Sequence, residues 1–245
     1  MGTESSTSGT APPDREVGAV LVAAGVSRRF GGARNKALVE LAGEPVLVHA
    51  ARALAAVAGA GVVVVARASE HAAMAAALAA GGLAEVRLVE GGAERADSVR
   101  LGLAALPADA TVVLVHDAAR PLVLPDDARR VVEAVREHGA ALLVEALVDT
   151  VKRSTDGRFA EATLDRAQLW RAQTPQGFDA ARLVELHARA AREGVSPTDD
   201  AALWERDGGR VALVEARGPN FKITRPLDLV LAEAVVRARA HDEDR

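Results

Sequence analysis

Short apolar runs alternate with amphipathic stretches along most of the chain. The apolar runs have the length of buried strands, and the stretches between them repeat apolar residues at helical spacing. Nearly continuous apolar strands separated by helices are typical of a mostly parallel sheet covered on both faces. We therefore predict an α/β fold with strands at 17–24, 61–67, 85–90, 110–117, 140–146 and 210–216, and helices at 45–58, 69–80, 94–106 and 125–138.

One segment interrupts this alternation. Residues 147–172 hold the pair Asp156-Gly157 between two short runs of partly alternating polarity, which predicts a β-hairpin. The hairpin would form a projecting arm whose apolar residues need a partner, and these residues are Phe159, Leu164, Leu169 and Trp170. The sequence leaves two partners open, a second copy of the chain in a homodimer or the arm's own domain.

The 245 residues are enough for one large domain, which we place at residues 17–240 with the arm inserted. The first sixteen residues are rich in Ser, Thr, Gly and Pro and lack an apolar core, so they are predicted to form a disordered tail rather than a signal peptide. The polar residues 241–245 are predicted to fray. No apolar run reaches the roughly 20 residues that a membrane span needs.

Composition narrows the possible chemistry. The chain has no cysteine, which excludes disulfides, thiolate metal sites and cysteine nucleophiles. The formal net charge is -4 with acidic and basic residues interspersed, so neither a nucleic-acid partner nor a membrane partner is predicted. The six histidines are scattered, which disfavours a zinc site. These features favour a cytoplasmic protein.

The loop after the first strand is the first candidate site, because ligands of such sheets bind beyond the carboxyl ends of the strands. Residues 23–36 read AAGVSRRFGGARNK. The loop lacks the G-x-G-x-x-G of a dinucleotide site and the Gly-Lys-Ser/Thr of a Walker loop. Its small residues would let a ligand approach the backbone, and Arg29 and Lys36 would offset negative charge, which suits a polyphosphate. A solvated basic loop explains the same pattern equally well.

A second candidate lies at residues 90–103. Gly91 and Gly92 follow a strand, and Arg95 and Ser98 open a helix. The free N–H groups of a helix start can bind polar ligand atoms. A plain turn with a surface arginine is the simpler interpretation of this motif by itself.

Strand ends farther along the chain carry more charge. Asp117 ends a strand, where a carboxylate can hold Mg²⁺ beside a phosphate, and Arg120 could bind a second anion. An Asp at this position is often only a helix cap, and His116 beside it is interpreted as a packed or surface residue because no nucleophile is near. The remaining candidates each also have an explanation as a turn or cap residue, and they are Arg166, Thr174, Thr198 and Lys222.

Together these segments resemble the 2-C-methyl-D-erythritol 4-phosphate cytidylyltransferases, enzymes of the non-mevalonate isoprenoid pathway that join CTP to a sugar-alcohol phosphate. The resemblance runs from about Val17 to Arg237, with the motifs in family order. The combination of VHDAARP, TPQ and N-aromatic-K-I-T is the most specific part. The motifs are AAGVSRRF…K (23–36), GGAERADSV (91–99), VHDAARP (115–121), DTVKR (149–153), LDRAQLWRAQTPQGF (164–178), TDDA (198–201) and NFKITRPLDL (220–229).

The resemblance implies a Rossmann-like nucleotidyltransferase sheet, CTP as the nucleotide, Mg²⁺ as the cofactor and a homodimer held through the arm. It implies that Arg29 and Lys36 stabilise charge at the reacting phosphate and that Asp117 is the Mg²⁺ ligand. The other residues that it places at the nucleotide are Ala23, Ala24 and Gly25 in the CTP-binding loop, Gly92, Arg95 and Ser98 at the nucleoside, and Ala118 at the ribose.

The second substrate, a polyol phosphate, has its own implied residues. By resemblance, Arg166 and Lys222 position the attacking phosphate, and Arg166 reaches across from the other subunit. The residues that look like sugar-phosphate contacts are Arg120, Thr150, Thr174 and Thr198. The chemistry is an in-line attack of a phosphate oxygen on the α-phosphorus of CTP. Because that nucleophile is already anionic, the barrier lies in bringing two anions together, and cations from several loops meet this need.

Two positions depart from the family's pattern. Asn35 stands where proline usually precedes the loop lysine, which predicts a less rigid loop. Ala93 stands where an Asp often follows the Gly-Gly pair, which puts one ribose contact in doubt. Two other functions remain as alternatives: a ribitol-5-phosphate cytidylyltransferase, which shares the loop and the chemistry, and a non-catalytic homologue that binds nucleotide. Retention of Arg29, Lys36, Asp117 and Lys222 together argues against the second.

Overall fold

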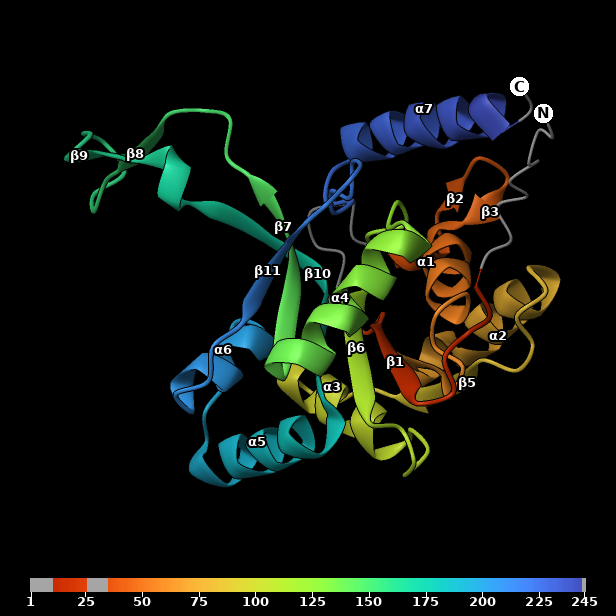
Figure 1. Cartoon of the computed structure of the whole chain (residues 1–245). Coiled ribbons are helices and arrows are strands. Elements are labelled where there is room, and N and C mark those ends of the chain that lie inside the picture. The colour runs from red at the N-terminus through yellow and green to blue at the C-terminus, as the bar shows by residue number, and fades with distance from the viewer. Residues whose placement is uncertain (1–10, 26–34, 244–245) are drawn as a thin grey trace, which may run out of the picture.

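The structure is a computed structural model that describes residues 11–25 and 35–243. Its centre is a seven-stranded sheet in the order β11-β7-β10-β6-β1-β4-β5 (Figure 1). Strand β10 runs antiparallel to both neighbours, and the other pairs are parallel, which confirms the predicted mostly parallel α/β sheet. The strands are β1 (Val17–Val22), β4 (Gly61–Ala66), β5 (Arg87–Glu90), β6 (Val112–Asp117), β7 (Ala140–Ala146), β10 (Trp170–Asp179) and β11 (Ala212–Glu215).

The strand order reverses beside β1. From β1 the chain passes to β4 and β5 on one side of the sheet and then crosses to β6 on the other side. In the register of the sheet, Val22 lies opposite Val65 of β4 and Asp117 of β6. The carboxyl ends of β1 and β6 are therefore level, and the reversal leaves a crevice between the loops that leave them, which is where such sheets bind ligands.

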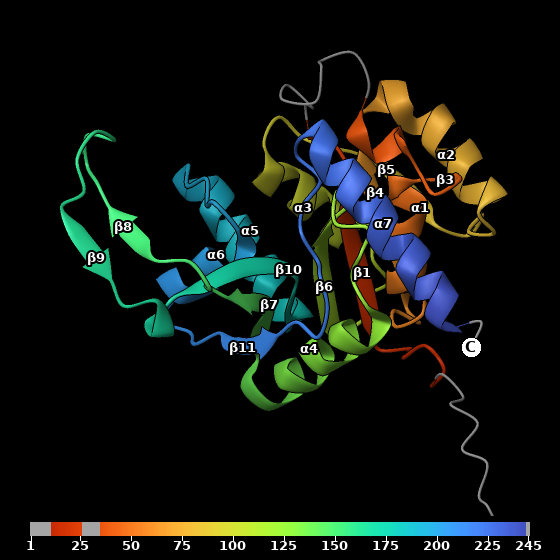
Figure 2. The same cartoon turned by 90° about the horizontal axis from the view of Figure 1, so that it is seen from above.

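Helices cover both faces of the sheet (Figures 1 and 2). Along β1 the side chains alternate, so that Leu21 packs in one apolar cluster and Val20 in the other. Burying one such side chain contributes roughly 1.5–3 kcal/mol, and the two clusters hold in place the strands that carry the site loops. The first cluster includes α1 (Val46–Ala55), α2 (His71–Ala80) and α4 (Pro125–His138), and the second includes α3 (Arg95–Ala104), α5 (Ala180–Glu193) and α6 (Asp200–Arg206).

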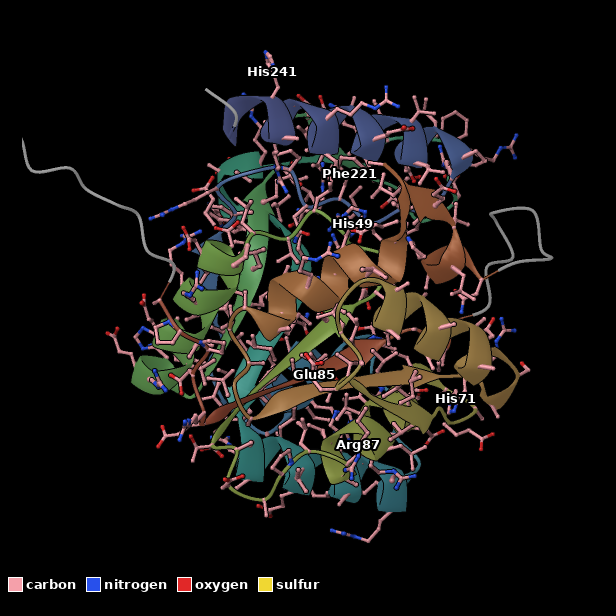
Figure 3. All side chains as sticks on the ribbon, turned by 90° about the vertical axis from the view of Figure 1, so that its right-hand side faces the viewer. His49, His71, Glu85, Arg87, Phe221 and His241 are labelled. Atoms are coloured by element: carbon pink, nitrogen blue, oxygen red, sulfur yellow. The ribbon has the colours of Figure 1, made fainter. Side chains whose placement is uncertain are left out.

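Helix α7 (Pro226–Glu243) closes a third, smaller apolar cluster near the hairpin of β2 (Glu40–Leu41) and β3 (Glu44–Pro45). Phe221 lies beneath this helix (Figure 3). The helix extends into residues 241–245, for which the sequence predicted fraying. Among the described residues, none of the helices is long and apolar enough to cross a membrane.

The arm, residues 147–172, contains the predicted hairpin. Strands β8 (Val151–Arg153) and β9 (Ala162–Leu164) pair antiparallel around the Asp-Gly turn, and the hairpin projects from the central sheet (Figure 2). Val148 and Phe159 are 73% and 71% exposed. The arm therefore does not pack back on its own domain, which was one of the two alternatives.

Two regions differ from the sequence-based prediction. Strand β10 has ten residues and is buried from Gln173 to Phe178. The pattern did not predict it, because most of its buried residues are polar or are Pro175, and its register with β7 shifts between Ala172 and Gln176. At the N-terminus, residues 11–16 fall in the predicted disordered tail, yet Asp14 N–H donates to the Val57 carbonyl at 2.9 Å. Folded structure begins before residue 17, because a single aspartate provides contacts that composition does not reveal. Residues 1–10 lie outside the described residues.

Candidate active site

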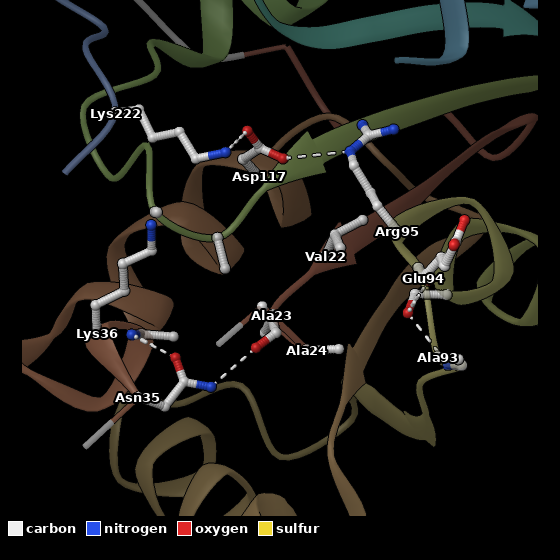
Figure 4. Close-up of a pocket in the computed structure, with 16 residues that line it drawn as sticks. Val22, Ala23, Ala24, Asn35, Lys36, Ala93, Glu94, Arg95, Asp117 and Lys222 are labelled. Carbon is white, nitrogen blue, oxygen red and sulfur yellow. Dashed lines mark hydrogen bonds and ion pairs between the residues drawn. The ribbon is translucent and has the colours of Figure 1, made fainter. Parts of the chain in front are cut away.

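A pocket opens at the carboxyl ends of β1, β5 and β6, where the strand order reverses (Figure 4). Its wall comes from residues 22–25, 35–37, 92–95 and 117–119, with Ser98 and Lys222. Segments that are far apart in the sequence thus meet around one cavity, as the loop positions predict. The predicted site residues that line it are Ala23, Ala24, Gly25, Lys36, Gly92, Arg95, Ser98, Asp117, Ala118 and Lys222.

Asp117 is the centre of a charged cluster in this pocket. The side chain ends β6 and is only 13% exposed. Its Oδ2 accepts a hydrogen bond from Lys222 Nζ at 2.7 Å, and its Oδ1 lies 3.9 Å from Arg95 Nε (Figure 4). On the other side, Arg120 Nε lies 3.9 Å from Oδ2. One carboxylate therefore draws three cationic side chains together from three different loops.

These cations determine the ionisation of Asp117. Burial by itself would raise the pKa of the carboxyl group, but the charges of Lys222, Arg95 and Arg120 outweigh burial and lower the pKa to about 2. Arg95 behaves in the same way: burial opposes its charge, while Asp200 and Asp117 raise the pKa of its guanidinium. At neutral pH the Asp117 carboxylate is therefore negatively charged and the Arg95 guanidinium is positively charged.

Beneath Asp117 lies a small hydrogen-bond network. The Asp117 N–H donates to Thr174 Oγ1 at 3.1 Å, and Thr174 Oγ1 lies 2.9 Å from His116 Nδ1. His116 is fully buried, burial lowers its pKa to about 4, and its Nε2 lies 3.0 Å from the Arg120 carbonyl. A neutral His116 donating from Nε2 and accepting from the Thr174 hydroxyl satisfies each contact. The interpretation of His116 as a packed residue is confirmed.

Lys36 follows a residue that fixes the turn on which it sits. Asn35 is 4% exposed, and its Oδ1 accepts from the Ala37 N–H at 3.0 Å, which caps the 3₁₀ turn η2 (Lys36–Leu38). Its Nδ2 donates to the Ala23 carbonyl at 2.9 Å (Figure 4). The same Nδ2 also donates to Glu70 Oε2 at 2.8 Å. Asn35 thus ties this turn to β1 and α2. Asn35 itself is held by these three hydrogen bonds, and a less rigid loop stays a prediction, because residues 26–34 lie outside the described residues.

Two glycines let the second loop approach the first. A Cβ atom on Gly91 would lie 2.7 Å from the Cβ of Ala24, and one on Gly92 would lie 2.2 Å from the Cβ of Asp97. Both distances are too short for any larger residue. The Gly92 N–H donates to Ser98 Oγ at 3.2 Å, and Ser98 Oγ donates to the Glu94 carbonyl at 3.1 Å. Ser98 is therefore a pocket residue that also holds its own loop in place.

Arg120 and Thr174 lie behind the pocket wall rather than in it. Arg120 donates to the Asn220 carbonyl at 2.8 Å, and burial lowers the pKa of its guanidinium. Thr174 is 5% exposed and its hydroxyl is used by Asp117 and His116. Both residues thus support Asp117 in this structure, and a sugar-phosphate contact by either of them stays a prediction.

The other predicted residues lie outside the pocket. Thr150 is exposed in the arm, and Arg166 opens the short 3₁₀ turn η4 (Arg166–Gln168) in the arm, where its guanidinium donates to the Val148 carbonyl. Thr198 is exposed just before α6. Arg29 lies outside the described residues. The pocket of one chain therefore lacks Arg166.

Sequence reasoning missed several buried residues that build the site. Asn220 donates to the Thr174 carbonyl at 2.8 Å, and Gln176 Oε1 accepts from the Asp200 N–H at 3.1 Å. His187 and Asp200 are buried together on α5 and α6. Three of these residues lie within predicted motifs: Asn220 in NFKIT, Gln176 in TPQGF and Asp200 in TDDA. The motifs could therefore have identified the residues, although the sequence does not predict their contacts.

Comparison with known proteins gives a consistent result. The family model described as IspD, 2-C-methyl-D-erythritol 4-phosphate cytidylyltransferase, matches residues 17–238. The chain is 43% identical over 223 residues to the enzyme of that name from Synechococcus sp. (strain WH7803), covering 90% of this chain and 99% of the relative. It is 45% identical over 240 residues to the enzyme of that name from Streptomyces avermitilis, covering 93% and 94%.

Solved structures agree with the sequence matches. The 2-C-methyl-D-erythritol 4-phosphate cytidylyltransferase from Thermus thermophilus superimposes with a TM-score of 0.72 at 37% identity, covering 89% of this chain and 98% of that one. A 4-diphosphocytidyl-2C-methyl-D-erythritol synthase from Anaerococcus prevotii superimposes with a TM-score of 0.78 at 25% identity, covering 90% and 96%. The chain therefore belongs to the family of 2-C-methyl-D-erythritol 4-phosphate cytidylyltransferases, and it is a nucleotidyltransferase.

Proposed function

We propose that the pocket binds CTP and that the chain transfers its cytidylyl group to 2-C-methyl-D-erythritol 4-phosphate. An oxygen of the polyol phosphate forms a bond to the α-phosphorus, the bond from that phosphorus to the bridging oxygen of the β-phosphate breaks, and pyrophosphate leaves with the electron pair. The products are pyrophosphate and 4-diphosphocytidyl-2-C-methyl-D-erythritol. The observation that carries this proposal is the convergence of Lys36, Arg95 and Lys222 on one pocket, where Arg95 and Lys222 pair with Asp117.

The charges of the pocket match the physical demand of this reaction. Both reactants are anions, and negative charge builds up on the phosphate oxygens and the leaving pyrophosphate. Lys36 and Lys222 line the pocket on the side that faces Arg95, so together these cations can offset the charge of both reactants (Figure 4). The chain needs no general base, since a phosphate monoester is already ionised at neutral pH. Arg29, outside the described residues, is proposed to join Lys36 at the triphosphate.

The backbone and the second loop are proposed to hold the nucleotide. Ala23, Ala24 and Gly25 present small side chains beside the pocket, so a triphosphate can approach their N–H groups. Gly92, Arg95 and Ser98 would hold the nucleoside, and Ala118 would border the ribose. Whether Ala93 loses a ribose contact stays open to a test with CTP and its 2′-deoxy analogue.

Asp117 fits a divalent cation as one ligand among several. Its carboxylate is ionised and ends a strand beside the pocket. Among the described residues no group of three or more His, Asp or Glu side chains could hold a metal. Mg²⁺ commonly binds through one or two carboxylates together with substrate phosphates and water, so we propose that Asp117 holds it against the triphosphate. Mg²⁺ bound there would offset phosphate charge and polarise the α-phosphorus.

The arm is proposed to complete the site of a second copy. Arg166 is absent from the pocket of its own chain, while Phe159 and Val148 on the same arm are exposed. A homodimer in which each arm embraces the partner would bury these apolar residues and bring Arg166 to the attacking phosphate. Thr150 lies on the same arm and would approach the sugar phosphate with Arg120, Thr174 and Thr198.

Pyrophosphate release tests the function. CTP and 2-C-methyl-D-erythritol 4-phosphate with Mg²⁺ should release pyrophosphate, and removal of the metal with a chelator should stop it. Faster turnover with ribitol 5-phosphate would favour the ribitol alternative, and binding of CTP without turnover of any polyol phosphate would favour the non-catalytic one. A cytoplasmic location and the absence of nucleic-acid and membrane partners stay predictions from composition.

A further inference from the structure

Asp200 is a buried carboxylate next to the nucleotide pocket, and neither the motifs nor the proposed reaction gives it a role. It is the first residue of α6, and its side chain is 0% exposed. Oδ1 accepts a hydrogen bond from His187 Nε2 of α5 at 3.0 Å. Oδ2 lies 2.8 Å from a terminal nitrogen of Arg95, the first residue of α3, in an ion pair that lacks hydrogen-bond geometry. A fully buried charge of this kind is costly unless each oxygen has a partner.

A hydrogen bond from the backbone N–H of Asp200 fixes its position. Gln176 of β10 is 2% exposed, and its Oε1 accepts from the N–H groups of Asp200 and Ala201, both at 3.1 Å. The Gln176 Nε2 donates to Asp199 Oδ2 at 2.9 Å. A buried side chain of the central sheet therefore sets where α6 begins. The Asp200 backbone is therefore anchored to the sheet.

Arg95 is held between two carboxylates. One of its terminal nitrogens contacts Asp200, its Nε lies 3.9 Å from Asp117 Oδ1, and its side chain keeps 27% exposure where it lines the pocket. An arginine that is free to rotate loses conformational entropy when it binds an anion. An arginine that is already held loses less. The contact with Asp200 therefore orients the guanidinium toward the pocket before a ligand arrives.

We infer that Asp200, supported by His187, is a positioning residue that holds Arg95 in the orientation needed to bind the nucleotide. The inference rests on the proposed binding of CTP in this pocket. A merely structural role would be to join α3, α5 and α6, in which case loss of the carboxylate would lower stability and leave nucleotide affinity alone. The two roles differ in a measurable way.

Calorimetric titration of the full chain with CTP and Mg²⁺, without the polyol phosphate, tests the inference. Asp200→Asn keeps the shape and an oxygen acceptor but loses the charge beside Arg95. We expect the Kd for CTP to rise about 3- to 10-fold, the effect of one side chain that must be ordered on binding. In turnover assays the KM for CTP should rise while the KM for the polyol phosphate stays unchanged. In an Arg95→Ala background, Asp200→Asn should add no further loss.

Neighbouring residues provide the controls. Asp207→Asn removes a carboxylate charge at the other end of α6, where its ion-pair partners are Arg182 and Arg189 rather than Arg95, so the Kd should not change. If Asp200→Asn does not fold, His187→Phe takes its place, because it removes the donor to Oδ1 and frees the carboxylate to rotate. His187→Gln, which keeps a donor, should restore the affinity.

The outcomes separate this inference from the proposed function. If the wild-type chain does not bind CTP, the proposed function fails. If the wild-type chain binds CTP and the folded Asp200→Asn variant binds equally well, only the positioning role is overturned. An equal loss in the Arg95→Ala background would also overturn it, because Asp200 would then act by another route.

Discussion

In the pocket, Asp117 is 13% exposed and bonded to Lys222 at 2.7 Å, whereas in the arm Phe159 is 71% exposed and Arg166 donates only to a backbone carbonyl. The pocket is assembled from loops of one sheet, and its side chains hold one another in place. The arm forms a regular β-hairpin, and its apolar side chains Val148 and Phe159 are exposed. The pocket is thus formed within one chain, while the arm has the properties of an element that acts on another chain.

The comparison supports the proposal that two copies of the chain share each site. Charges that must be fixed before substrate binds sit on the sheet, where buried neighbours hold them. In the proposed homodimer the arm would deliver Arg166 only after two chains associate, which would make activity depend on the dimer. Variants that affect one region and leave the other intact test this division.

The largest expected effect is in the pocket. Lys36→Ala should lower kcat roughly 10²- to 10³-fold, the scale of one lost charge-stabilising contact. The free energy of unfolding should barely change, because Lys36 lies on a short turn and carries little core packing. The arm offers a matched control, Lys152→Ala, which removes a lysine bonded to Thr163 and should leave kcat unchanged. A folded Lys36→Ala variant with near-normal kcat would support the alternative of a solvated basic loop.

Acid should lower the stability of the folded chain through His116, which is buried beneath Asp117. The pKa of His116 is about 4 in the folded chain because the side chain is buried, and its ordinary value is 6.5. Between these values the unfolded chain binds more protons, so stability is lost as pH falls from about 6.5 to 4, by roughly 3 kcal/mol. Urea unfolding at several pH values measures this. His116→Gln should flatten the loss in that window, and an unchanged slope in this variant would assign the acid sensitivity to other groups.

The arm should respond to loss of apolar surface. Phe159→Ser should raise the dimer dissociation constant about 30-fold, the scale of a central apolar contact in an interface. Sedimentation across a concentration series measures the constant, and activity per chain should fall at the concentrations where monomers form. CTP binding by the monomer should persist, because the pocket lies within one chain. An unchanged dimer would remove the arm from the interface.

The smallest effect should come from Asn35. Asn35→Ala removes the cap of η2 and both tethers to β1 and α2, so we expect about 1 kcal/mol lower stability and roughly 10-fold lower kcat. Glu70→Gln keeps an oxygen that can accept from Asn35 and should cost much less. In a Lys36→Ala background the Asn35 substitution should no longer lower kcat. A full further loss there would mean that Asn35 does not act through Lys36.

The sequence predicted the parts of the site that follow strand ends. Ala23 and Asp117 lie at the ends of apolar runs, and the parallel sheet brings such ends together. It did not predict partners that are distant along the chain. Asn35 bonds to Glu70, and Thr174 bonds to His116, and nothing local in the sequence fixes either pair. Strand β10 was missed for a related reason, since Pro175 interrupts its pattern while tertiary packing keeps it buried.

For the arm, the sequence predicted the local structure but not its orientation. Its hairpin was predicted correctly from Asp156-Gly157, because a turn is a local property of the sequence. The direction in which the arm points depends on how β7 and β10 leave the sheet, and this could not be predicted from the pattern. In the proposed homodimer the residues that the arm contacts belong to another chain, so an experiment with two chains is needed to identify them.

Subunit complementation tests the central claim most directly. Arg166→Ala and Lys36→Ala should each be nearly inactive, and equal amounts should regain activity once subunits exchange. Random reassortment gives one intact site in each heterodimer, which is about one site in four overall if each site takes Lys36 from its own chain and Arg166 from its partner. A tag pull-down confirms the exchange. No recovery despite confirmed exchange would contradict the account, because every site would then keep one of the two lesions.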